Sequence, residues 1–171
     1  MTDTSKKQIY FIDTSALITI FRFYPEELKE PIWAKLKDMF ETGQLISHRL
    51  VYEEITIGSK NPDLLSVKVI PLREYFLTQQ YSQALIVSEI VFRFPQLIDA
   101  TREKEQADPW LISIAVERQQ GSEDKEDVFL VSEESEQKKG KIPDACKHFN
   151  IEHINLDKFF KKIRISFSMK E

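Results

Sequence analysis

The 171-residue sequence has little glycine and one cysteine, and each scarcity excludes a class of protein. Its four glycines lie too far apart for the glycine-rich loops that bind nucleotide phosphates. Because Cys146 stands alone, no internal disulfide can form, and we expect the protein in a reducing compartment, the cytoplasm. The thiol itself is interpreted as a small buried apolar group. One cysteine and three histidines also form no zinc-binding pattern.

Long apolar runs are missing as well. No run approaches the roughly 20 residues of a membrane span, and the N-terminal residues MTDTSKKQ lack the apolar core of a secretion signal, so no membrane association is expected. The net charge of −4 weighs against non-specific nucleic-acid binding, which usually requires a basic surface. With 42% apolar and 30% charged residues, the chain is expected to be one globular domain, 1–171.

Short β-favouring runs alternate with longer segments of helical periodicity. Strands are predicted at Gln8–Ile12, Leu45–Ser47, Val128–Ser132 and Ile151–Asn155, and Val67–Ile70 is interpreted as extended. Helices are predicted between these runs. Strands that alternate with helices favour a mostly parallel sheet covered on both faces. We therefore expect an α/β protein, a three-layer α/β/α sandwich.

Prolines and potential caps determine the predicted helix boundaries. Pro31 is expected to open the second helix, and Tyr75–Phe94 to form one continuous helix. Asp108 is expected to cap a later helix, with Pro109 at the first helical position.

Acidic side chains follow the predicted strands, at the edge where open parallel sheets bind ligands. Asp13 follows the first strand, and Glu133 and Glu134 follow VFLVS. Glu54 lies on the helix after the second strand, and Asp108 at a helix start. Carboxylates in one crevice raise each other's pKa unless a cation is present. Oxygen ligands of this kind suit Mg²⁺ or Mn²⁺, which activate water and stabilise charge on a phosphodiester.

Each acid also has an ordinary structural interpretation. Taken singly, Asp13 and Asp108 are interpreted as helix caps, the commonest role of an Asp in such a place. Taken singly, Glu54 is a solvated helix residue and Glu134 part of an exposed acidic turn. The residues alone leave both interpretations open.

The order of the acidic motifs resembles that of PIN-domain nucleases. The opening PIN motif, an apolar strand closed by Asp-Thr-Ser or Asp-Thr-Asn, is similar to FIDTSALI, and the helix glutamate before an aliphatic residue is similar to Glu54 in LVYEEI. The third motif, an Asp that opens an apolar helix, is similar to ADPWLISIA. The fourth, a hydroxyl residue followed two positions later by an acid, is similar to Ser132 and Glu134 in LVSEE. The segment KIPDAC and the long insert before ADPW resemble a bacterial PIN-like subfamily, DUF4411.

The resemblance implies a PIN fold and a metal-dependent endoribonuclease, often the toxin of a toxin–antitoxin pair. It implies that Mg²⁺ or Mn²⁺ is held by Asp13, Glu54 and Asp108. Glu134 would complete the acidic ring or orient the attacking water. A supporting hydroxyl would come from Thr14, Ser15 or Ser132. Contacts with the RNA substrate are expected from Lys138, Lys139 and Lys141.

Two features depart from the family pattern. PIN domains commonly have Asp at the fourth position, where this chain has Glu134 with Glu133 and Asp144 as rivals, and Ser15 stands where many members have Asn. The expected partners are RNA, an antitoxin protein and a second copy of the chain. The alternating tail Ile165, Phe167 and Met169 is interpreted as a dimer contact, an added strand or a cover for the core, and we favour the cover.

Two other functions remain open. A phosphatase of the haloacid-dehalogenase kind also carries a carboxylate after its first strand, but it needs a second Asp two positions later, where this chain has Ser15. The other is a PIN-like binding module that keeps the fold without catalysis. An RNA cleavage assay with titrated metal separates this module from a nuclease.

Overall fold

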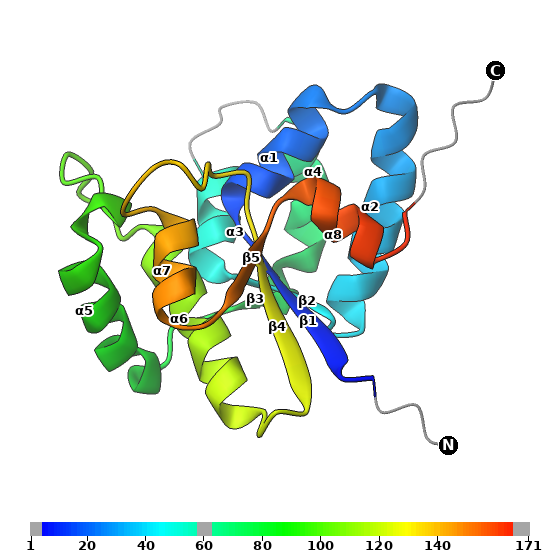
Figure 1. Ribbon diagram of the computed structural model, residues 1–171. Coiled ribbons are helices and arrows are strands. Elements are labelled where there is room, and N and C mark those ends of the chain that lie inside the picture. Colours follow the sequence, from blue (N-terminus) through cyan, green and yellow to red (C-terminus); the bar gives the residue numbers. More distant parts are fainter. Residues whose placement is uncertain (1–4, 58–62, 166–171) are drawn as a thin grey trace.

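Five parallel strands form the centre of the computed structural model, which describes residues 5–57 and 63–165 (Figure 1). The strands are β1 (Lys7–Ile12), β2 (Leu45–His48), β3 (Phe76–Leu77), β4 (Glu126–Val131) and β5 (Glu152–Ile154). Their order in the sheet is β3-β2-β1-β4-β5, and every pairing is parallel. The carboxyl ends of the strands therefore share one edge of the sheet.

Helices connect the strands. The α-helices are α1 (Thr14–Phe23), α2 (Glu26–Glu41), α3 (Arg49–Thr56), α4 (Leu64–Val69), α5 (Ala84–Arg93), α6 (Ala107–Gly121), α7 (Ile142–His148) and α8 (Leu156–Lys162). The described residues also form the short 3₁₀ segments η1 (Ile70–Tyr75), η2 (Tyr81–Gln83) and η3 (Pro95–Leu97). In the described part of the chain, no helix is long and apolar enough to cross a membrane.

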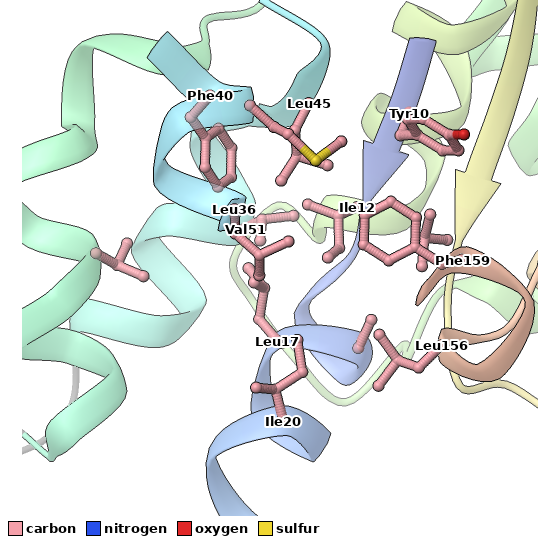
Figure 2. Packing of buried hydrophobic residues seen from close by; sticks show 14 of the residues in the cluster. Tyr10, Ile12, Leu17, Ile20, Leu36, Phe40, Leu45, Val51, Leu156 and Phe159 are labelled. Carbon is pink, nitrogen blue, oxygen red and sulfur yellow. The ribbon is translucent and has the colours of Figure 1, made fainter. Parts of the chain in front are cut away.

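The sheet is buried on both faces. Along β1, Tyr10 and Ile12 face a core built with α1, α2, α3 and α8, whereas Ile9 and Phe11 face a second core built mainly with α6 and α7. Figure 2 shows the first core, in which the Phe159 ring meets Tyr10 edge-on at 5.0 Å. Burying one such side chain stabilises the fold by about 1.5–3 kcal/mol. The expected α/β/α sandwich is confirmed, and the continuous apolar run of β1 is explained by burial on both faces.

The third strand was not anticipated. The segment Val67–Ile70, interpreted as extended, is helical and ends α4, and the single helix expected over Tyr75–Phe94 is divided into β3, η2 and α5. β3 has only two residues, and it pairs with Ser47 and His48 at the sheet edge. So short a strand owes its conformation to this pairing rather than to local periodicity, which is why the pattern misses it.

The start of the second helix also differs from expectation. α2 begins at Glu26, and Pro31 lies inside it rather than at its start. A proline there removes one hydrogen bond, to the carbonyl of Glu27, but Glu27 is exposed and water can replace that bond.

At the C-terminus Ile165 packs against the first core, in agreement with a covering role, while Phe167 and Met169 lie outside the described residues.

Candidate functional site

Asp13 occupies the turn between β1 and α1, where it caps the helix. Its Oδ1 accepts the Ala16 N–H at 2.9 Å, and the Ser15 hydroxyl lies 2.9 and 2.8 Å from its two carboxylate oxygens. The residue is 3% exposed. Burial raises the pKa of Asp13 to about 7; the two bonded residues oppose the rise and the charge of Glu134 adds to it. A carboxylate this deep is costly to ionise unless a cation is near.

Asp108 lies in the first turn of α6. It is not the cap as expected, because the helix starts at Ala107 with Gln106 as N-cap, and Pro109 is accordingly its third residue. Burial raises the pKa of Asp108 to about 8, and the charges of Asp13, Glu134 and Glu54 raise it further. Four carboxylates from distant parts of the chain thus act on one region at the carboxyl edge of the sheet.

Glu54 connects the first and third acidic motifs. Its side chain leaves α3 and accepts the Thr14 hydroxyl at 2.5 Å through Oε2 and the Ala107 N–H at 3.3 Å through Oε1. Thr14 adjoins Asp13 in sequence and Ala107 adjoins Asp108, so both contacts bring the carboxylate to the other two acids. The second contact is also favourable because the first turn of α6 carries partial positive charge.

The three rivals for the fourth position have different partners. Glu133 accepts the Leu156 N–H of α8 at 2.7 Å, and Asp144 accepts the Gly140 N–H at 2.7 Å. Glu134 accepts the Ile142 N–H of α7 at 2.9 Å through Oε2. Of the three, only the charge of Glu134 raises the pKa of Asp13 and Asp108. Glu134 is therefore the fourth acid in the proposal below.

The predicted hydroxyl residues brace these acids. Ser15 bonds Asp13 and accepts the Glu133 N–H at 3.0 Å, which ties the end of β4 to α1. Ser132, fully buried, accepts the Glu134 N–H at 3.3 Å and lies 2.7 Å from His153 Nε2. His153 on β5 was missed by the sequence reasoning. Its only signal was its place in a short strand, and the contact with Ser132 depends on the β4–β5 pairing.

The three predicted lysines are placed differently. The Lys141 ammonium donates to the Gln96 carbonyl at 2.8 Å, and its charge lowers the pKa of Asp108. Lys138 and Lys139 are exposed in the loop between β4 and α7. Of these three lysines, Lys141 is the one whose charge acts on an acid of the site.

The acids do not form a ready-made chelate. Among residues 5–57 and 63–165, no group of three His, Cys, Asp or Glu side chains is arranged to hold a metal ion. Several carboxylate oxygens are instead occupied by the hydrogen bonds described above. The donor set nevertheless fits Mg²⁺ or Mn²⁺, since it consists of carboxylates alone and since a divalent cation would offset the repulsion that raises the pKa of Asp108.

Two cavities open beside Glu54. One, of about 620 Å³, lies between α3 and the loop 102–106. The other, of about 530 Å³, is lined by residues of α1, α2, α3 and α4. Glu54 lines both, so a ligand that meets this carboxylate has space on either side of it.

The raised carboxyl pKa values predict that metal-free protein loses stability as the pH rises. A carboxyl group with a folded-state pKa above its unfolded value binds more protons when folded, so this contribution falls from about pH 4 through pH 8. Replacing Asp108 with Asn should therefore raise the melting temperature in chelator at pH 8.5 by a few degrees, about 1 kcal/mol, and less at pH 5. Equal melting temperatures of parent and variant at pH 8.5 would contradict the raised pKa of Asp108.

The fold is similar to that of a chain in the crystal structure of VapBC2 from Rickettsia felis bound to a DNA fragment from their promoter. The TM-score is 0.50 at 14% identity, over 87% of this chain and 99% of that chain. This likeness and the sheet order place the chain in the PIN-like class of α/β folds.

The sequence comparison identifies the family. Residues 10–167 match the family described as Domain of unknown function (DUF4411), and the chain belongs to it. No curated protein sequence matches the chain significantly.

Proposed function

We propose that this chain is a metal-dependent endoribonuclease and the toxin of a toxin–antitoxin pair that acts in the cytoplasm. The observation that carries the proposal is the position of Glu54, whose carboxylate accepts from Thr14, next to Asp13, and from Ala107, next to Asp108. The charges of Asp13, Glu54 and Glu134 also raise the pKa of the buried Asp108. Parallel strands by themselves bring the acids that follow them to one edge, but they do not account for the helix residues Glu54 and Asp108 acting at the same place. A cluster of carboxylates with raised pKa values, at the edge of the sheet where ligands bind, is typical of a functional site.

In this proposal the cation is bound by Asp13, Glu54 and Asp108. When bound, Mg²⁺ or Mn²⁺ would activate water and neutralise charge on the phosphodiester. Ser15 and Thr14 orient two of the ligands through the hydrogen bonds that they donate to Asp13 and Glu54.

Glu134 and Lys141 have complementary roles in the proposal. Oε2 of Glu134 is engaged by the Ile142 N–H, which fixes the side chain and leaves Oε1 to accept a proton from water. Lys141, whose ammonium bonds Gln96 and whose charge acts on Asp108, would contact the RNA phosphate, together with the exposed Lys138 and Lys139 of the same loop. The basic surface formed by these three lysines is small, in keeping with the net charge of −4.

A protein partner is the second part of the proposal. The similar Rickettsia felis chain belongs to a complex named VapBC2. An antitoxin that covers the acidic edge would suppress cleavage until it is removed. The main alternative is a binding module of the same fold, since the hydrogen bonds that occupy the carboxylates would also suit a purely structural cluster.

Metal titration tests the catalytic proposal. Purified protein should cleave single-stranded RNA when Mg²⁺ or Mn²⁺ is added, and excess EDTA should stop the cleavage because the cation would lower the pKa of the attacking water and offset charge on the phosphodiester. An Asp13→Asn preparation purified in parallel controls for contaminating nuclease. Undiminished cleavage in EDTA would exclude the metal mechanism, and metal-independent RNA binding without cleavage would favour the binding module.

A further inference from the structure

The larger cavity beside Glu54 has the composition of a ligand site. Its apolar surface comes from Leu50 and from Ile57, which is 59% exposed. Arg102, Glu103 and Lys104 line the opposite side. Its volume of about 620 Å³ is ample for a nucleobase with its sugar, within the range of small-molecule sites.

The loop that forms this wall is held in shape. Gln106 donates its amide to the Asp99 carbonyl at 2.8 Å and accepts the Asp99 N–H at 2.9 Å, which closes the loop at its base. Asp99 also accepts the backbone N–H and the hydroxyl of Thr101 at 3.0 and 2.6 Å. Glu105 accepts the Gln79 amide at 2.6 Å. A wall ordered in advance reduces the entropy cost of binding a ligand.

The charges of the cavity favour one kind of ligand. Arg102 pairs with Asp99, and Glu53 pairs with Arg49. In the described part of the chain, neither Glu103 nor Lys104 has an ion pair, so both are available to a ligand. A carboxylate only accepts hydrogen bonds and an ammonium only donates them. The pair therefore suits a ligand that presents an amino edge to Glu103 and a phosphate to Lys104.

We propose that this cavity binds the base of the nucleotide next to the phosphodiester that is cut, and that it prefers bases with an exocyclic amino group. The base packs against Leu50 and Ile57, Glu103 accepts from its amino group and Lys104 contacts its phosphate. Cytosine is accepted and uracil, which has a carbonyl at the same position, is disfavoured. Because the base must enter the cavity, paired bases are excluded. This inference rests on the proposed nuclease function.

Cleavage mapping on random-sequence single-stranded RNA tests the preference. One position beside the cut should contain cytosine in excess of uracil by about tenfold, the worth of one charged hydrogen bond. Glu103→Gln should remove that preference, because an amide both donates and accepts. Lys104→Ala should raise KM several-fold with kcat little changed. Glu123→Gln and Lys125→Ala, an exposed acid–base pair in the loop before β4, are the matched controls and should change neither quantity.

Binding separates failure of this inference from failure of the nuclease proposal. In EDTA, fluorescence anisotropy should show tighter binding of oligocytidylate than of oligouridylate, and Glu103→Gln should equalise the two. Equal binding of both oligonucleotides by the parent, or a preference that survives Glu103→Gln, would overturn the inference while leaving cleavage untouched. A parent that shows the preference but cleaves no RNA with any metal would retain the base preference of the cavity and overturn the nuclease proposal.

Discussion

Replacing Asp13 with Asn is expected to reduce RNA cleavage by about a hundredfold or more, because the cation loses a charged ligand worth several kcal/mol. The fold should persist. Asn is as good an N-cap as Asp, so the contact with the Ala16 N–H survives. Removing a buried carboxyl with a pKa of about 7 should leave the metal-free melting temperature unchanged or higher. Thermal melting and initial cleavage rates measure the two effects.

The chain offers a matched control for this substitution. Asp63 caps α4 as Asp13 caps α1: it accepts the Ser66 N–H and the Ser66 hydroxyl, both at 2.8 Å. Its charge does not contribute to the raised pKa of Asp13 or Asp108. Asp63→Asn should therefore leave cleavage unchanged. If Asp13→Asn cleaves RNA as fast as Asp63→Asn does, Asp13 is only a helix cap.

Expression of the parent chain without a partner is expected to arrest bacterial growth, and Asp108→Asn should relieve the arrest at equal protein level. Asp108 is where the charges of the other three acids converge, so its loss should weaken metal binding most. Colony counts after induction, with immunoblots for protein level, measure the effect. Asp63→Asn should remain as harmful as the parent.

The opposite outcome is also informative. Parent protein that is soluble and folded but harmless at high level would favour the binding module. A parent and an Asp108→Asn variant that are equally harmful would show that growth arrest does not depend on the acidic site. In either case the cleavage assay decides whether the chain is a nuclease.

The sequence by itself determined the architecture because local patterns encode it. Runs such as IYFI and VFLV are apolar enough for burial on both faces, and their alternation with helical segments predicts the parallel sandwich. The acids at the strand ends were also visible, since parallel strands deliver whatever follows them to one edge. The helix starts at Pro31 and Asp108 were wrong because tertiary packing determines how far a helix extends beyond its local signal.

Only the tertiary structure decided how the acids relate to one another. Glu133, Glu134 and Asp144 are chemically alike in sequence, and their different partners depend on where α7 and α8 begin in space. The same holds for β3, which exists through its pairing with β2, and for His153, which meets Ser132 across the sheet. A contact between residues far apart in the chain changes the hydrophobic periodicity of neither segment, so composition and spacing cannot reveal it.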